Sequence, residues 1–441
     1  MLHHKEDILK TIQQSISVQS HLRFNYAAAM TSFLRPLEYI QNGYRFLNLT
    51  QDYSKTILQD KPFLLLGAGP SVDQNIEWIQ KNHKNFVIVI VSALMSKFES
   101  LQIKPDIITH VHGYTDAMPH IENVKDLTFF DKSIKIFGSM SYPPFVEKFS
   151  KENLYFIESS SNYKENFGSV SASNIGTITY GLLLTLGVKE LYLLGLDYAV
   201  NQKTGATHIE NYANTQGTTY SQTLEISKES TAPVVATKEL VEVEGNLSDK
   251  VKTTVFFNSM KEECNAVSRS YKKEITQCYN LSNGAKLNNT LPKDVEDIEN
   301  LLVVDKENLS QELKKVFDTR SELYLTSLEK KSIEESINYS DKVIEELYLY
   351  LELPIKDLAT YHDSLIKIFS IFLDTTQDKK SYDIDAIMKL YIKFISGYIF
   401  DLLNTQEVEE KLSIEELKTL VIPQMIQVVK YYRDSVLKLI S

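Results

Sequence analysis

The sequence of 441 residues has few cysteines, no excess of positive charge and no long hydrophobic run. Cys264 and Cys278 are too few for a disulfide framework in a chain of this length, so they indicate buried thiols in a reducing compartment. The formal net charge of −11 argues against a protein that binds nucleic acid through a basic surface. Because no apolar stretch is long enough to span a membrane and the N-terminus lacks a signal-peptide core, we expect a cytoplasmic protein.

Three motifs of nucleotide-binding proteins are missing as well. The glycine-rich stretch Gly67–Ser71 has no third glycine for a dinucleotide fingerprint, because Val72 stands in its place. No Gly-Lys-Ser/Thr follows, so the stretch is not a P-loop. The motif Asp-x-Asp, which usually binds the metal ion of nucleotide-sugar diphosphates, does not occur around the predicted strand ends. We therefore expect no cofactor and a metal-independent reaction, although a dispersed metal site stays open.

What this stretch does contain is typical of a ligand-binding turn between a strand and a helix. The apolar run Phe63–Leu66 predicts a strand buried on both faces of a parallel sheet. Gly67 and Gly69 allow a sharp turn and a close approach to a ligand, because neither has a Cβ. Pro70 suits the first helical turn, and the N–H groups around Ser71 would form a seat for phosphate. The alternative is a tight turn that holds no ligand.

Hydrophobic periodicity divides the chain into three parts. Residues 1–60 are predicted to be helices packed against a sheet, and residues 291–441 to form a bundle of helices. Residues 61–290 alternate strands with helices, which predicts an α/β fold with a Rossmann-like, mostly parallel sheet. The predicted strands after the first are Phe86–Val91, Ile107–Val111, Ile134–Phe137, Leu154–Ile157, Leu191–Leu194 and Ile275–Tyr279. Ligands bind such sheets beyond the carboxyl ends of the strands, so the residues there are the candidates for a site.

Several polar residues follow these strand ends. His110 and His112 lie two residues apart on one face of a strand, with Asp116 nearby, but no third metal ligand is evident. A single His112 that hydrogen-bonds a ligand is favoured over a metal site. His208 lies in a polar loop after Asp197 and could act as a general base, or could simply stabilise the loop. The tyrosines that could donate to a leaving phosphate, or could serve only in packing, are Tyr198, Tyr212 and Tyr220.

A set of short motifs, taken in order, resembles the motility-associated factor (Maf) glycosyltransferases of flagellated bacteria. The motifs are Gly67–Ser71, Pro105-Asp106, Asn174-Ile175-Gly176, Leu186–Asp197, Glu244-Gly245-Asn246, Val251-Lys252-Thr253 and Tyr279–Lys286. They cover roughly residues 60–290, and a helical C-terminal domain is also a feature of that family. The central domain is similar to bacterial sialyltransferases that use CMP-sialic acid without a metal.

The resemblance implies a transferase that moves a nonulosonic acid, either pseudaminic or legionaminic acid, from its CMP-activated donor to Ser/Thr hydroxyls of flagellin. The C-terminal helices would supply a docking surface for that acceptor protein. The sialyltransferase base would fall near Asp249–Lys252, where no histidine occurs, so His208 is the substitute catalytic candidate, together with Asp197. The candidate donor-binding residues are Gly67, Ala68, Gly69, Pro70, Ser71, Ser92, His112, Asn174, Gly176 and Tyr198. Ala68, Ser92 and His112 stand where those enzymes have asparagines.

Two alternatives remain at this stage. The same glycine-rich domain occurs in archaeal pterin diphosphokinases, which transfer diphosphate from ATP and would need Mg²⁺. A non-catalytic flagellin-binding scaffold could also keep the nucleotide-binding fold. The sequence leaves open which sugar is moved, which Ser/Thr sites are used, and whether the chain forms a homo-oligomer.

Overall fold

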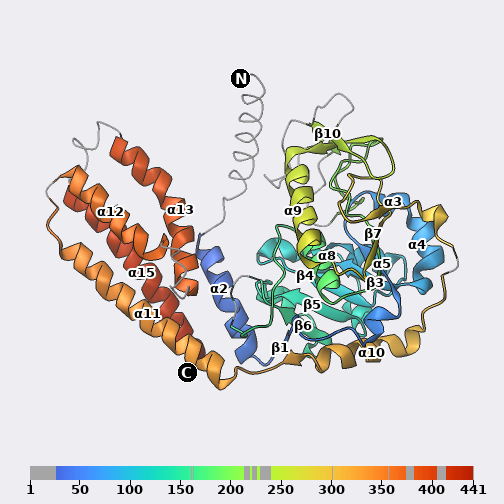
Figure 1. Cartoon of the computed structure of the whole chain (residues 1–441), viewed down its shortest axis with the longest axis horizontal. Helices are drawn as coiled ribbons and strands as arrows, with labels where there is room; N and C mark the ends of the chain where they lie inside the picture. The colour runs from blue at the N-terminus through green and yellow to red at the C-terminus, as the bar shows by residue number, and fades with distance from the viewer. Residues whose placement is uncertain are drawn as a thin grey trace. The chain divides into compact units, whose positions relative to one another are not determined.

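The computed structural model describes residues 26–159, 161, 163–212, 219–220, 226–228, 240–299, 301–355, 357–373, 382–404 and 414–440 (Figure 1). The described chain divides into two compact units. The sheet unit contains Tyr44–Ser159 and Asn166–Leu323. The helical unit contains Asn25–Gly43, Ser160–Glu165 and Tyr324–Ser441. The helical pattern predicted for residues 1–25 lies outside the described residues.

The sheet unit is built around one sheet of ten strands. In spatial order these are β13 (Leu291–Pro292), β12 (Gln277–Asn280), β7 (Glu190–Leu194), β2 (Pro62–Leu66), β3 (Val87–Val91), β4 (Ile107–His110), β5 (Ile134–Gly138), β6 (Leu154–Ile157), β1 (Arg45–Leu47) and β14 (Ser321–Glu322). All neighbouring strands are parallel except β1 and β14. The mostly parallel α/β sheet predicted from the alternation of strands and helices is confirmed.

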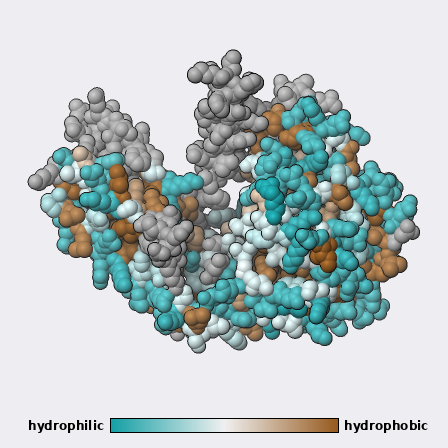
Figure 2. All heavy atoms as spheres, viewed as in Figure 1, coloured by the Kyte–Doolittle hydropathy of each residue, from teal (hydrophilic) through white to brown (hydrophobic). Residues whose placement is uncertain are grey.

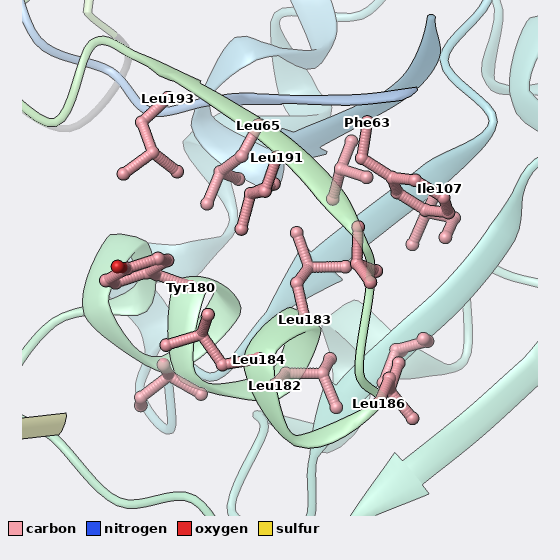
Figure 3. Packing of buried hydrophobic residues seen from close by; sticks show 14 of the residues in the cluster. Phe63, Leu65, Ile107, Tyr180, Leu182, Leu183, Leu184, Leu186, Leu191 and Leu193 are labelled. Carbon is pink, nitrogen blue, oxygen red and sulfur yellow. The ribbon is translucent and has the colours of Figure 1, made fainter. Parts of the chain in front are cut away.

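The central strands are buried on both faces, as expected for a parallel sheet. All five residues of β3 are buried. Helix α8 (Ile175–Thr185) covers one face, and Leu183 points from it toward side chains of β2 and β7 (Figure 3). Leu182, Leu183 and Leu184 are each at most 1% exposed, so α8 is anchored firmly to the sheet. This packing fixes the position of the helix N-terminus beside the strand ends.

The order of the strands reverses beside β2. Strands β2 to β6 follow one another in space on one side, whereas β7 and β12 lie on the other side of β2. Such a reversal creates a topological switch point at the carboxyl ends of the two strands that flank it. Here those ends are the stretch after Leu66 and the stretch after Leu194.

The remaining elements of the sheet unit connect or extend the sheet. The helices are α3 (Ser71–Gln74), α4 (Ile76–Asn82), α5 (Met95–Ser100), α6 (Pro119–Glu122), α7 (Pro143–Val146), α9 (Val255–Tyr271) and α10 (Lys306–Asp318). Two antiparallel hairpins pair β8 (Thr219–Tyr220) with β9 (Ile226–Lys228) and β10 (Leu240–Glu244) with β11 (Lys250–Thr254). The polar stretch after Asp197, where the sequence indicates a loop, is thus followed by these two hairpins.

The helical unit consists of α2 (Tyr26–Gln41), α11 (Ser327–Glu352), α12 (Leu358–Leu373), α13 (Asp383–Asn404) and α15 (Ile414–Ile440). Helix α2 packs on α13 and α15, which differs from the prediction that the N-terminal helices pack against the sheet. Lys164 and Glu329, both buried, pair at 3.0 Å and join the segment Ser160–Glu165 to the start of α11. The bundle predicted for the C-terminal region is therefore present and is completed by two earlier pieces of chain.

Both boundaries between the units differ from the sequence-based division at residues 60 and 290. Phe46, within the stretch 1–60 predicted to be helical, lies in β1 and pairs with β6. Past residue 290, α10 buries Leu309, Leu313 and Phe317 in the core of the sheet unit. Short strands such as β13 and β14 have too few residues for a periodic signal, because their position depends on the neighbouring strand.

None of the described helices combines the length and the apolar character that crossing a bilayer requires. Hydrophobic side chains do appear at the surface among hydrophilic ones (Figure 2). In the helical unit the exposed ones on α11 include Leu328, Tyr348 and Leu349.

Candidate active site

The turn after β2 is held against the turn after β7 by main-chain hydrogen bonds. The amide of Gly67 donates to the carbonyl of Leu194, and the amide of Gly69 donates to the carbonyl of Gly195, both at 2.9 Å. A Cβ at Gly69 would clash with the carboxylate of Asp197, and one at Gly67 would clash with the carbonyl of Gly195. The two glycines are thus required by the close contact between two strand ends.

Asp197 lies over this turn and is only 5% exposed. Its carboxylate accepts hydrogen bonds from the hydroxyl of Ser71 and, at 3.4 Å, from the Ser71 amide. The Ser71 hydroxyl oxygen in turn accepts from the amide of Asn283 at 2.8 Å. Burial raises the pKa of Asp197 to about 6, although the hydrogen bonds from Ser71 oppose the shift. The carboxyl group can therefore change its protonation state close to neutral pH.

This arrangement differs from the seat for phosphate expected at the turn. The amides of Gly67, Gly69 and Ser71 all have partners within the fold, and the partner of Ser71 is an acidic side chain. Helix α3 has only four residues and contributes little dipole. Pro70 is the N-cap residue of that helix and is buried, whereas Ala68 is partly accessible.

The N-terminus of α8 forms a second polar group at the same edge. The side chain of Asn174 caps the helix by accepting from the Thr177 amide and donating to the Thr177 hydroxyl, each at 2.8 Å. The Thr177 hydroxyl also bonds the Tyr198 hydroxyl at 2.8 Å. Gly176 lies where a Cβ would come within 2.9 Å of the Leu196 side chain. Burial raises the pKa of Tyr198 well above its usual value, so it remains a neutral hydrogen-bonding group.

A third group lies at the ends of β3 and β4. Ser92 is buried, and its hydroxyl bonds Nδ1 of His110 at 2.8 Å and Nδ1 of His120 at 2.9 Å. His112 is more exposed, and its Nε2 pairs with Asp116 at 2.9 Å. Ser92 and His112, predicted to bind the same ligand, therefore belong to different hydrogen-bonded pairs.

The loop after β7 brings His208 beside the turn after β2. The amide of Ile209 donates to the carbonyl of Ala68 at 3.0 Å. The His208 ring stacks on Tyr212 with 4.3 Å between ring centroids, and its Nδ1 bonds the Thr207 hydroxyl at 3.0 Å. Burial lowers the pKa of His208 to about 4, so the ring is neutral at pH 7 and can accept a proton. The side chain of Tyr220 lies outside the described residues.

Comparisons with known proteins place this geometry in a wider context. A family model described as "6-hydroxymethylpterin diphosphokinase MptE-like" matches residues 31–203. No curated protein sequence matches this chain. A solved structure, "MAf glycosyltransferase from Magnetospirillum magneticum AMB-1", is similar over 93% of this chain, with a TM-score of 0.65 and 15% identity. The chain covers 61% of that structure, about three fifths of its length.

This chain has the Maf glycosyltransferase fold. The resemblance inferred from the short motifs is thereby confirmed at the level of the fold. Within the Maf fold, the elbow Gly67–Ser71 contacts Asp197 at the switch point, through hydrogen bonds from Ser71. Asn174 and Tyr198 are linked because both form hydrogen bonds with the Thr177 hydroxyl. Among the described residues, no three His, Cys, Asp or Glu side chains gather in a way that could hold a metal ion.

Three residues of the candidate active site are not among those predicted from the sequence. His120 lies in the short helix α6, well past the end of β4 and outside any strand-end pattern. Asn283 and Gly284 lie in the motif Tyr279–Lys286 but are not among the predicted site residues. The Asn283 amide nevertheless bonds the Ser71 hydroxyl, and a Cβ on Gly284 would clash with the backbone of Asp197. One signal was available for His120, because three of the nine histidines fall between residues 110 and 120.

Proposed function

We propose that this chain is a glycosyltransferase. Its donor would be a CMP-activated nonulosonic acid, either pseudaminic or legionaminic acid. The acceptors would be Ser/Thr hydroxyls of flagellin, in a modification needed for flagellar assembly and motility. The observation that carries the proposal is the similarity to a Maf glycosyltransferase over 93% of this chain. The choice of donor and acceptor rests on the motif resemblance.

The polar groups at the carboxyl edge of the sheet are compatible with such a transfer. When CMP leaves, the sugar develops an oxocarbenium-like centre, which needs only a positioned hydroxyl and a modest base. His208 is neutral at pH 7, because burial holds its pKa at about 4, and could take the proton of the acceptor hydroxyl. Asp197 would act as a positioning residue, since its carboxylate holds Ser71 and thereby the shape of the elbow.

The exposed part of this edge indicates where the donor phosphate would lie. Because the amides of Gly67, Gly69 and Ser71 are engaged, we expect accessible side chains nearby to bind the leaving phosphate. The side chain of His112 is 39% exposed, and its Nε2 bonds Asp116 at 2.9 Å, so the ring is held at this edge and remains accessible to a ligand. We assign His112 to the donor phosphate on this ground.

Thermal-shift measurements on the full chain test the donor class. We expect stabilisation by CMP without added metal, because a ligand that binds only the folded state stabilises it by about 2.7 kcal/mol at a hundredfold excess over Kd. UDP should stabilise the chain less. A transfer assay with purified flagellin and each CMP-nonulosonic acid, read by intact mass, then tests the reaction. If CMP gives no shift and no sugar is transferred, the proposal is wrong.

The family model that matches residues 31–203 favours a second candidate, a diphosphokinase acting on a pterin-like substrate. That reaction would transfer diphosphate from ATP to a hydroxyl and would require Mg²⁺ to bridge the phosphates. Stabilisation by ATP only in the presence of Mg²⁺, with no response to CMP, would favour this candidate over the first.

A further inference from the structure

A buried chain of hydrogen bonds joins two histidines at the carboxyl ends of β3 and β4. His110 is 1% exposed, Ser92 is 1% exposed and His120 is 6% exposed. The Ser92 hydroxyl lies between the two rings, 2.8 Å from Nδ1 of His110 and 2.9 Å from Nδ1 of His120. The His110 ring stacks on Phe145 with 3.8 Å between centroids, so its orientation is fixed.

The partners of this chain decide where each proton lies. Nε2 of His110 is 3.2 Å from the carbonyl oxygen of His112, which can only accept, so Nε2 carries the proton. In a neutral ring Nδ1 of His110 is then an acceptor, and it takes the only hydroxyl proton of Ser92. The Ser92 oxygen can consequently only accept from His120, so Nδ1 of His120 carries a proton. Nε2 of His120 is left with a bare lone pair.

That lone pair is buried and has no hydrogen-bond partner among the described residues. Both rings remain neutral, because burial lowers the pKa of His110 well below its usual value and that of His120 to about 4. A buried acceptor without a donor destabilises the folded state, so a native fold that retains one calls for an explanation. A ligand donor at this position would satisfy the atom.

The surroundings of His120 belong to the candidate active site. The charges of His112 and Asp116 act on it, and the ring of Tyr212 lies 6.4 Å away between centroids. Tyr212 stacks on His208, whose neighbour Ile209 bonds the elbow at Ala68. Ring contacts through Tyr212 and His208 therefore link His120 to the loop that bonds the elbow at the switch point, where α/β sheets bind nucleotides.

We propose that Nε2 of His120 accepts a hydrogen bond from an N–H or O–H group of the bound nucleotide. This inference rests on the proposed function, since it assumes a nucleotide donor at this edge of the sheet. Ser92 and His110 are positioning residues, because they hold the His120 ring in the tautomer that leaves Nε2 bare. The donor on the nucleotide is either the amine of cytosine or a ribose hydroxyl.

A matched pair of substitutions isolates the acceptor atom. In His120→Asn the shorter amide can still donate to Ser92 from the position of Nδ1 but places nothing at Nε2. In His120→Gln the longer amide can place an oxygen near the position of Nε2. Calorimetry on the full chain should show CMP binding weakened roughly five- to tenfold in the Asn variant, the value of one hydrogen bond. Most of that loss should be recovered in the Gln variant.

Different nucleotides identify the donor group and separate this inference from the proposed function. If the Asn variant no longer distinguishes CMP from UMP, the amine is the donor. If it loses affinity for both equally, the donor is a ribose hydroxyl, and either result supports the inference. Unchanged CMP affinity in the Asn variant overturns it while the proposed function stands. If the wild type binds only ATP with Mg²⁺, the proposed function is wrong, and the same two variants decide the inference with ATP. If no nucleotide binds, both are overturned.

A second measurement needs no ligand. In the full chain labelled with ¹⁵N-histidine at pH 7, the His120 signals, assigned by their loss in His120→Asn, should show a protonated Nδ1 and an unprotonated Nε2. A protonated Nε2 in His120 would contradict the inference whatever the binding data show.

Discussion

The pH dependence of folding offers a sharp test of the structure around Asp197. Burial raises the pKa of its carboxyl group from 3.8 to about 6, so the folded state binds the proton more tightly than the unfolded state does. The resulting stabilisation is fully present below pH 3.8 and is lost as the pH rises through 6. The difference between the folded-state and unfolded-state pKa values corresponds to about 3 kcal/mol in the free energy of unfolding. Between pH 5 and pH 8 the loss should be about 1.4 kcal/mol.

The substitution Asp197→Asn isolates this effect, because the amide keeps the size of the side chain and does not titrate in this range. Subtracting the free energy of unfolding of the variant from that of the wild type removes the contributions of the other titrating groups. The difference should fall by about 1.4 kcal/mol from pH 5 to pH 8. This direction is opposite to that of a carboxylate stabilised by a salt bridge.

Urea unfolding followed by tryptophan fluorescence is a suitable assay. Trp78 is the only tryptophan in the sequence, lies in α4 and has its ring centroid 5.7 Å from that of Phe86. Its signal therefore reports on the sheet unit that contains Asp197. Ser71→Ala is the matched probe of the hydrogen bond, and it should raise the pKa of Asp197 further and so steepen the decline. If the difference in free energy of unfolding between wild type and Asp197→Asn stays constant or rises with pH, the reasoning is refuted.

Three further predictions concern other parts of the chain. Replacing His208 with alanine should slow sugar transfer by about 10²–10⁴-fold while flagellin binding is kept, and unchanged transfer rates would remove His208 as the base. Replacing Glu329 with alanine removes the carboxylate that neutralises the buried Lys164 ammonium, so thermal unfolding should show the helical unit destabilised by about 3–5 kcal/mol. The exposed Glu242→Ala serves as control, and equal effects of the two substitutions would contradict the burial argument. Replacing Gly176 with alanine brings a Cβ against Leu196 and should lower the free energy of unfolding by about 1–3 kcal/mol in chemical denaturation. If the clash is the cause, the additional substitution Leu196→Ala should reduce this loss.

The parallel sheet could be predicted because its central strands are long apolar runs. A strand buried on both faces, such as β3, carries its own signal in the sequence whatever its neighbours are. The carboxyl-edge residues followed from the same pattern, since every parallel strand ends at that edge. Predicting Ser92, His112 and Asp197 as edge residues thus required no knowledge of contacts.

The pairings among those residues could not be predicted in the same way. Ser71 meets Asp197 although 126 positions separate them, and Asn283 reaches Ser71 from 212 positions away. The strands β1 and β14 have three and two residues, so only their neighbours in the sheet determine them. The N-terminal helix α2 carries an apolar stripe that would suit either unit, and its packing on α13 and α15 decides which.

The sequence by itself determined the α/β class, the glycine elbow and the helical C-terminal part, because these depend on local composition and periodicity. Only the tertiary structure decided that the elbow faces a buried carboxylate and that one nitrogen of His120 has no hydrogen-bond partner among the described residues. The physical reason is that burial and hydrogen bonding belong to pairs of groups distant in the chain. A residue's pKa and tautomer therefore follow from its neighbours in space, which periodicity does not encode.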